Sequence, residues 1–206
     1  VGDVLQVSMD AQYESPDDLL IPDSEMVLGP GYADFDATAA TAGCPGYFSS
    51  HSERVNGREM TAPEIVELIA KEYSVGPRVL LTMLEVRGQW LSRSELSWEQ
   101  ITYPLGFTDR GESWGGLYYQ LSLAADSLNG GFYSWWEDST WLFQLGDGTF
   151  IEYSSQINAG TAGVQRALGR TAGSYEAWLS DLESFARLYQ EYFGAPFDYA
   201  VEPLVP

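Results

Sequence analysis

One stretch of the sequence limits the possible folds more than any other: residues 77–91, PRVLLTMLEVRGQWL. Gly76 and Pro77 begin a helix there, and its apolar residues cover most of the circumference rather than one stripe: Val79, Leu80, Leu81, Met83, Leu84 and Val86. A helix that is apolar on most sides has to be surrounded by other elements. The pattern predicts a mainly α (α+β) domain around a central buried helix.

The flanking segments predict further helices and one β-hairpin. Thr61-Ala62-Pro63-Glu64 is a capping box that begins a helix with an apolar stripe. The other elements are expected over 116–128 (a helix closing at Asn129, Gly130 and Gly131), 141–153 (a hairpin around Gly146-Asp147-Gly148), 161–168 (a short helix) and 174–194 (a helix from the Ser174 cap to Gly194).

Residues 1–48 differ from the rest in composition, being rich in Asp, Pro, Gly and Ala with little periodicity. We expect an extended arm there, packed on the domain, with one short helix near 34–42. Residues 49–206 form the helical domain itself. The chain of 206 residues is short enough for one core.

Charge and composition exclude several partners. The formal charge of −20 repels phosphate backbones and anionic lipid surfaces, so we expect neither nucleic acid nor membrane as a partner. The chain starts at Val1 rather than Met, which fits removal of a signal peptide, and we expect a monomer that is secreted or associated with a bacterial cell wall.

The few cysteine and histidine residues also limit the chemistry. With Cys44 and His51 as the single residues of their types, a zinc set of Cys and His is excluded, and no metal or cofactor is expected. The serines around His51 indicate a polar loop, so we expect a solvent-exposed histidine. The early aspartates lack the spacing of an EF-hand.

Glu85 is the main candidate for catalysis. A carboxylate in a nearly all-apolar helix loses hydration, which raises a carboxyl pKa and suits a general acid. Gly88 lies one turn further on and leaves space beside it. The alternative is a buried Glu paired with Arg87, Arg78 or a neighbouring amide.

PRVLLTMLEVRG, after a capped helix ending in EYSVGP, resembles the helix of soluble lytic transglycosylases and goose-type lysozymes that carries the catalytic Glu. GGLYYQLSLAADSLNGG resembles their glycine-led helix, and INAGTAGVQRAL a later helix start. The whole arrangement is also similar to exported bacterial cell-wall proteins with such a region ahead of peptidoglycan-binding or peptidase modules. The resemblance covers roughly residues 61–168. It implies a lysozyme-like fold with Glu85 as general acid, Gln120 and Tyr119 lining a sugar cleft, and Asn158 near it.

Two further groups of residues are candidates for glycan binding or catalysis. Flat aromatic rings suit the faces of pyranose sugars. Six aromatic residues cluster between the helix expected over 116–128 and the hairpin expected over 141–153: Tyr118, Tyr119, Tyr133, Trp135, Trp136 and Trp141. A lytic transglycosylase needs one carboxyl group, whereas a hydrolase needs a second, for which the candidates are Asp126, Glu137, Asp138, Asp147 and Glu152.

These observations favour an enzyme that cleaves a β-1,4-linked amino-sugar polysaccharide, most naturally peptidoglycan. A chitinase or chitosanase is an alternative, because the negative charge suits cationic chitosan. The other alternative is a non-catalytic module that binds cell-wall glycan or a protein. It is favoured by Val86, where the transglycosylase pattern has Ser, and by the lack of that family's Ala-Tyr-Asn motif, for which Tyr175 is the positional candidate.

Overall fold

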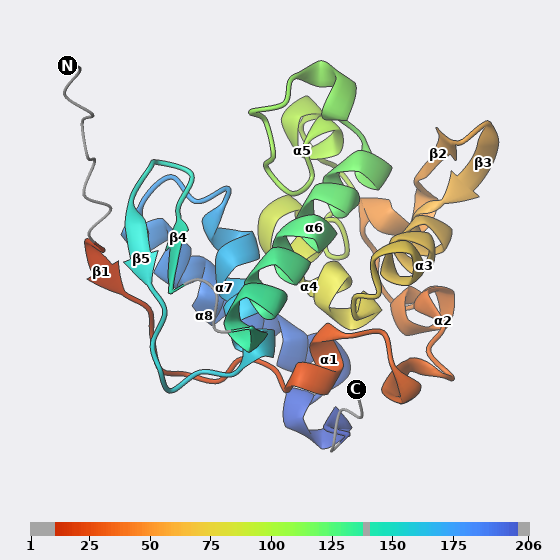
Figure 1. Ribbon diagram of the computed structural model, residues 1–206. Helices are drawn as coiled ribbons and strands as arrows, with labels where there is room; N and C mark the ends of the chain where they lie inside the picture. The colour runs from red at the N-terminus through yellow and green to blue at the C-terminus, as the bar shows by residue number, and fades with distance from the viewer. Residues whose placement is uncertain (1–10, 138–140, 202–206) are drawn as a thin grey trace.

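The computed structural model describes residues 11–137 and 141–201, which are mainly α-helical, as the sequence predicts. The described residues form α1 (Asp23–Met26), α2 (Ala37–Thr41), α3 (Ala62–Tyr73), α4 (Pro77–Gly88), α5 (Trp98–Thr102), α6 (Leu117–Trp136), α7 (Ala159–Gly169) and α8 (Tyr175–Phe193). Figure 1 shows α4 in the middle, with α2 and α3 on one side and α7 and α8 on the other. None of these helices combines the length and apolarity needed to cross a membrane.

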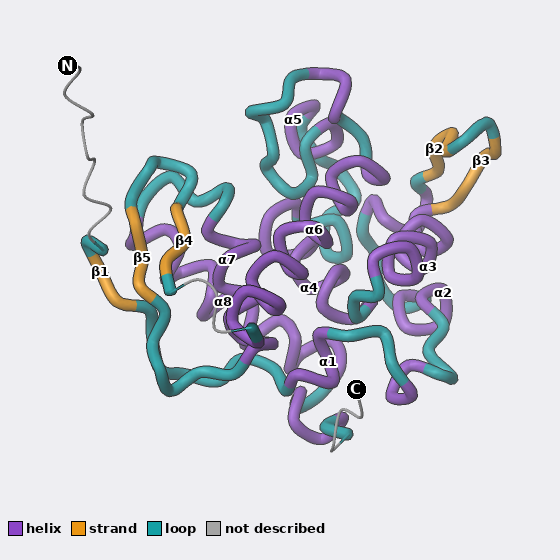
Figure 2. Tube along the Cα trace, viewed as in Figure 1, coloured by secondary structure: helices purple, strands orange, loops and turns teal. Residues whose placement is uncertain are grey.

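The strands form two small sheets, seen in Figure 2. They are β1 (Tyr13–Glu14), β2 (Ser52–Val55), β3 (Arg58–Thr61), β4 (Leu142–Gln144) and β5 (Phe150–Glu152). β5 pairs in parallel with β1 and antiparallel with β4, so β4 is an edge strand of the order β1-β5-β4. The predicted hairpin over 141–153 is confirmed as β4 and β5.

The second hairpin, β2 and β3, is absent from the expectations above. Its turn is Asn56-Gly57, and both residues have positive φ, 50° and 83°. Asn-Gly between two short strands is the sequence signal of a type I′ turn. The strands themselves are mostly polar and exposed, so they lack the alternation of apolar residues by which a strand is usually predicted.

Helix α4 is buried along most of its length, as its apolar surface predicts, and it contacts α3, α6 and α8. The helix ends three residues earlier than the stretch 77–91 suggests. Gln89 adopts the left-handed conformation, with φ 55°, and turns the chain back toward the helix end. That reversal determines the surroundings of Glu85.

Helices α6 and α7 cross closely, and glycines make the crossing possible. A Cβ on Gly131 would lie 2.7 Å from the carbonyl oxygen of Ala162, and one on Gly163 would lie 2.9 Å from that of Leu128. The expectation that Asn129, Gly130 and Gly131 end this helix is therefore wrong, because α6 continues to Trp136. The packing of two helices outweighs the low helix propensity of glycine here.

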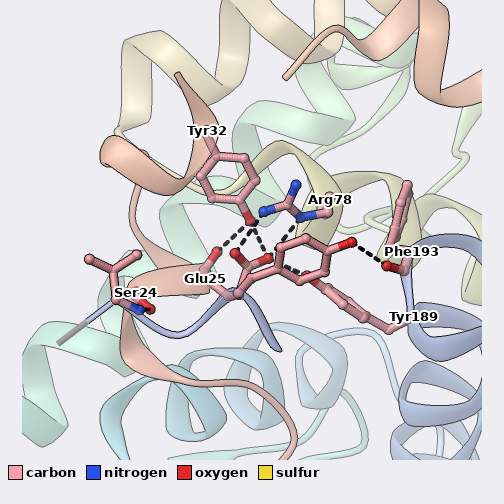
Figure 3. Close-up of polar contacts among 8 residues, drawn as sticks. Ser24, Glu25, Tyr32, Arg78, Tyr189 and Phe193 are labelled. Atoms are coloured by element: carbon pink, nitrogen blue, oxygen red, sulfur yellow. Dashed lines mark hydrogen bonds and ion pairs between the residues drawn. The ribbon is translucent and has the colours of Figure 1, made fainter. Parts of the chain in front are cut away.

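An ion pair attaches the N-terminal segment 11–48 to the helices (Figure 3). The Glu25 carboxylate, fully buried in α1, accepts hydrogen bonds from Arg78 Nε at 2.9 Å and Nη2 at 2.8 Å. The hydroxyls of Tyr32 and Tyr189 also donate to it. Burial, followed by the charge of Glu25, raises the pKa of Tyr32, so this tyrosine stays protonated as a donor.

Candidate functional site

The Glu85 carboxylate is directed into the turn that follows α4. The residue is 5% exposed, and Oε2 accepts hydrogen bonds from the backbone N–H groups of Leu91, at 2.8 Å, and Ser92, at 3.3 Å. Glu85 forms no ion pair with an arginine of the described segments, and it does not line the groove of about 750 Å³ described below. Of the two interpretations of this residue, the geometry favours a carboxylate paired with neighbouring amides.

The two polar residues expected in a sugar cleft also have internal partners. Gln120 is fully buried, and its amide bonds to the backbone of Phe107 and to the carbonyl of Trp114. Asn158 caps α7 by accepting from Thr161 N–H. The expectation that Gln120 faces a sugar is wrong, because no surface of its amide remains free.

The aromatic candidates do not gather in one cleft. Tyr119 and Trp136 are both exposed, but they lie 17 positions apart on α6, which is about 25 Å along a helix axis. Tyr118 and Tyr119 line a small pocket of about 220 Å³ beside β2. Tyr133 is exposed on α6, whereas Trp135 packs against Trp141.

The proposed second carboxylates of the described segments make no described contact with Glu85. Asp126 and Glu137 are exposed on or just after α6, and Glu152 is exposed on β5. Asp138 lies outside the described residues. The structure therefore does not assemble the predicted glycosidase constellation at the end of α4.

His51 belongs to a structural cluster rather than to an exposed loop, so the expectation of a solvent-exposed histidine is wrong. Its side chain is 11% exposed and its Nε2 lies 3.3 Å from Glu53 Oε2. The Glu53 carboxylate accepts from the N–H groups of Leu117, at 2.9 Å, and Tyr118, at 2.7 Å. Burial raises the pKa of Glu53, but the bonds from His51, Tyr118 and Leu117 outweigh it and lower the pKa overall. Glu53 thus caps the first turn of α6.

One pocket among the described residues is a groove of about 750 Å³. One wall is the β4–β5 hairpin over residues 142–150, and the other is the loop 106–109 after α5. The last turn of α7, the connection to α8 and Ser134 of α6 complete the lining. Figure 1 shows β4 on the inner side of its sheet, next to α7. The volume is in the range of ligand-binding sites.

Two arginines at the end of α7 line this groove, Arg166 in the last turn of the helix and Arg170 at its C-cap. Arg166 and Arg170 are four positions apart, so they share one face of the helix. Arg166 Nη1 donates to the carbonyl of Gly130 at 3.0 Å, and the Arg170 guanidinium lies 5.9 Å from the Phe107 ring centre. Although the chain has 30 acidic residues, neither arginine pairs with an acidic residue of the described segments. The lining thus holds two arginines, which have no described acidic partner, together with the two aspartates Asp109 and Asp147.

The loop 106–109 is held in place as a wall of this groove. Gln120 bonds to both backbone groups of Phe107, and Gly106, with φ 81°, lies against the Thr171 side chain. Gln120 thus contributes to the candidate site indirectly, by fixing the wall.

A family model, that of the LasA N-terminal domain, matches residues 19–203. The chain belongs to this family. No curated protein and no solved structure matches the chain. The lysozyme-like resemblance therefore stays a prediction.

In this member of the LasA N-terminal domain family, one sequence signal of the groove is available before the fold is known. Arg166 and Arg170 are two of only ten basic residues, at helical spacing within a predicted helix. No acidic residue stands three or four positions away from either one in the sequence, so neither has a partner on its own helix. That absence distinguishes them from Arg187, which pairs with Glu191 one turn away on α8.

Proposed function

We propose that this chain is a non-catalytic interaction domain that binds a peptide segment of another protein in the groove between the β4–β5 hairpin, the loop 106–109 and the end of α7. The observation that supports this most is the pair Arg166 and Arg170, which have no acidic partner in the described chain. A guanidinium group is a donor fork suited to carboxylates. A groove of this size that holds two such arginines is suited to binding a ligand from outside.

The groove is poorly equipped for catalysis. Among the described residues that line it there is no histidine or cysteine, and its carboxyl groups are those of Asp109 and Asp147. Both are exposed, and Asp147 accepts from Thr149 N–H within the hairpin turn. General acid catalysis on a glycan needs a carboxyl group set against the reacting bond and shielded from water. The groove offers neither feature.

A peptide fits the lining better than a sugar does. Sugar sites present flat, exposed rings, whereas Phe107 and Phe143 in this groove are almost fully buried. Main-chain groups and short polar side chains make up much of the remaining lining, including Gly106, Gly146 and Gly173. Such surfaces match the alternating apolar and polar groups of a polypeptide.

The test is a selection from a displayed library of random heptapeptides, carried out against the purified chain and against two tryptophan variants. Gly173 lines the groove and a Cβ there meets no atom within 4 Å, so Gly173→Trp fills the groove without strain. Gly43 is equally open but lies outside the groove, so Gly43→Trp is the matched control. We expect binders that retain affinity for Gly43→Trp and lose it for Gly173→Trp. Absence of enrichment, or equal binding by both variants, would overturn the proposal.

The same two variants separate peptide binding from the glycan hypotheses. Purified cell walls and chitosan are incubated with the chain, and the soluble products and the bound protein are measured. We expect no cleavage products and no binding that depends on Gly173. Cleavage that disappears in Glu85→Gln would instead establish the glycosidase, and wall binding lost in Gly173→Trp would assign the groove to a glycan.

A further inference from the structure

We infer that the ligand of this groove is an extended peptide that pairs with the free edge of β4 and places one carboxylate against Arg166 and Arg170. This inference rests on the proposed function, because it specifies how the same groove binds its peptide. It depends on two independent features, the backbone of β4 and the charge of α7.

The first feature is the unpaired edge of β4. Tyr153 N–H donates to Trp141 and Leu145 N–H to Thr149, so Phe143 between them is bonded to β5 as well. The backbone groups of Leu142 and Gln144 consequently point away from β5. No backbone group elsewhere in the described chain bonds to them. On the far side of the sheet the equivalent groups of β5 are already bonded to the segment that contains β1.

An unpaired strand edge beside a groove is a template for another strand. Leu142, Phe143 and Gln144 all contribute to the groove lining, so the edge and the pocket are continuous. Strands rise about 3.3 Å per residue, so a strand of three residues contacts a segment of only about three to five residues. The recognised motif is therefore short.

The second feature is the position of the two guanidinium groups. Arg166 lies across α6 at Gly130, where a Cβ would come within 3.3 Å of Cζ, and its bond to the Gly130 carbonyl holds it there. Arg170 is placed one turn further along the same face, over Phe107. Two donor groups in one groove, of which Arg166 is held in position, select a carboxylate over a neutral side chain.

The surrounding charge limits the ligand to few carboxylates. Asp109 and Asp147 flank the groove and the whole chain carries a charge of −20, so a polyanionic ligand is repelled. One Glu or Asp aligned with the arginines avoids this repulsion. The arrangement thus favours a mainly apolar or neutral segment with a single acidic side chain.

The backbone part is tested by N-methylating, one at a time, the amides of a heptapeptide selected from the library above. Pairing with a strand edge uses every second N–H of the ligand. We expect affinity to fall at least tenfold at alternate positions of the paired three- to five-residue segment and to change less than twofold at the other positions. A loss at every position, or at none, would overturn the strand pairing while leaving peptide binding in place.

The charge part is tested by replacing the acidic residue of the same peptide with its amide and by Arg170→Gln in the protein. Each change is expected to reduce affinity about tenfold, and the two together little more than either alone. Arg58→Gln removes an equal charge from an exposed site on β3 and is expected to leave affinity within twofold. If the selected peptides bind in the groove yet show no acidic preference, or if Arg58→Gln weakens binding as much as Arg170→Gln, the assignment to a carboxylate is wrong. The proposed function would survive that result.

Discussion

Arg78 and the pair Arg166 and Arg170 place guanidinium groups in opposite surroundings. Arg78 is buried and bonded twice to Glu25, and rings of Tyr32 and Tyr199 lie within about 4 Å of its Cζ. The groove arginines are only partly buried and have no acidic partner in the described segments. A charge whose partners are built into the fold stabilises the fold, whereas a charge without them can bind a ligand. Substitutions should separate the two kinds by their effect on stability.

Arg78→Met should have the largest effect. It leaves the fully buried Glu25 carboxylate without its counter-charge, and breaking one side of a buried ion pair costs about 3–5 kcal/mol. The free energy of unfolding, measured by urea denaturation at neutral pH, should fall by that amount. If the free energy of unfolding fell by less than about 1 kcal/mol, Arg78 would contribute as little to the stability of the fold as the groove arginines are expected to contribute.

The control for this prediction is the double variant Glu25→Gln with Arg78→Met. It removes both charges and leaves a neutral amide near the Tyr32 and Tyr189 hydroxyls. Replacing a whole buried pair by neutral groups is often nearly neutral for stability. The double variant should therefore be more stable than Arg78→Met alone.

Glu85 extends the comparison to carboxylates. Glu85→Ala removes the acceptor of the buried Leu91 N–H, which should cost about 1–3 kcal/mol of unfolding free energy. Glu85→Gln keeps an oxygen at that position and should cost less. Thermal or urea unfolding of both variants shows which of them is the more stable. An active-site acid often costs stability, so Glu85→Gln being more stable than the natural chain would revive the catalytic hypothesis.

The fold was predictable from sequence where a local pattern determines the element. The capping box at Thr61 and Glu64, the apolar surface of α4 and the Ser174 cap of α8 are each local, and all three lie where they were expected. The continuation of α6 through Gly130 and Gly131 was not predictable. It depends on the close approach of α7, which no short window of sequence contains.

The same distinction applies to the site. Burial of Glu85 follows from its apolar neighbours, but its partners at Leu91 and Ser92 depend on the chain reversal at Gln89. The left-handed position of that reversal is occupied by glutamine rather than by glycine, the residue that usually indicates such a turn in a sequence. The groove depends on segments about 35 and 60 positions apart in the sequence, brought together by packing. Its two arginines are visible in the sequence, whereas its walls are not.

Removing the Glu53 carboxylate should reduce the free energy of unfolding by an intermediate amount, and this reduction should depend on pH. Its pKa in the folded chain lies below the ordinary value of 4.5, so the folded state binds this proton less tightly than the unfolded chain does. The resulting stability is present above that value and is lost as the pH falls through the folded-state pKa. Glu53→Gln should cost about 1 kcal/mol at neutral pH.

Urea denaturation of Glu53→Gln and the natural chain from neutral pH down to acid tests this dependence. The difference between the two chains should shrink as the pH falls below about 4.5. Glu95→Gln is the control, since Glu95 is exposed and bonds to no described residue. If Glu95→Gln shows the same pH dependence, general charge repulsion rather than the cap of α6 is the cause.

Arg170→Gln should have the smallest effect on stability. The side chain is partly exposed. Its described interaction is a weak cation–π contact, because Cζ lies 5.9 Å from the Phe107 ring centre, close to the limit of about 6 Å for such contacts. We expect the free energy of unfolding to change by less than about 0.5 kcal/mol, because no buried group loses a partner. Urea denaturation of Arg170→Gln beside Arg78→Met measures the contrast directly. A loss above about 2 kcal/mol would show that Arg170 stabilises the fold, and the groove would then lack the free charge on which a carboxylate-bearing ligand depends.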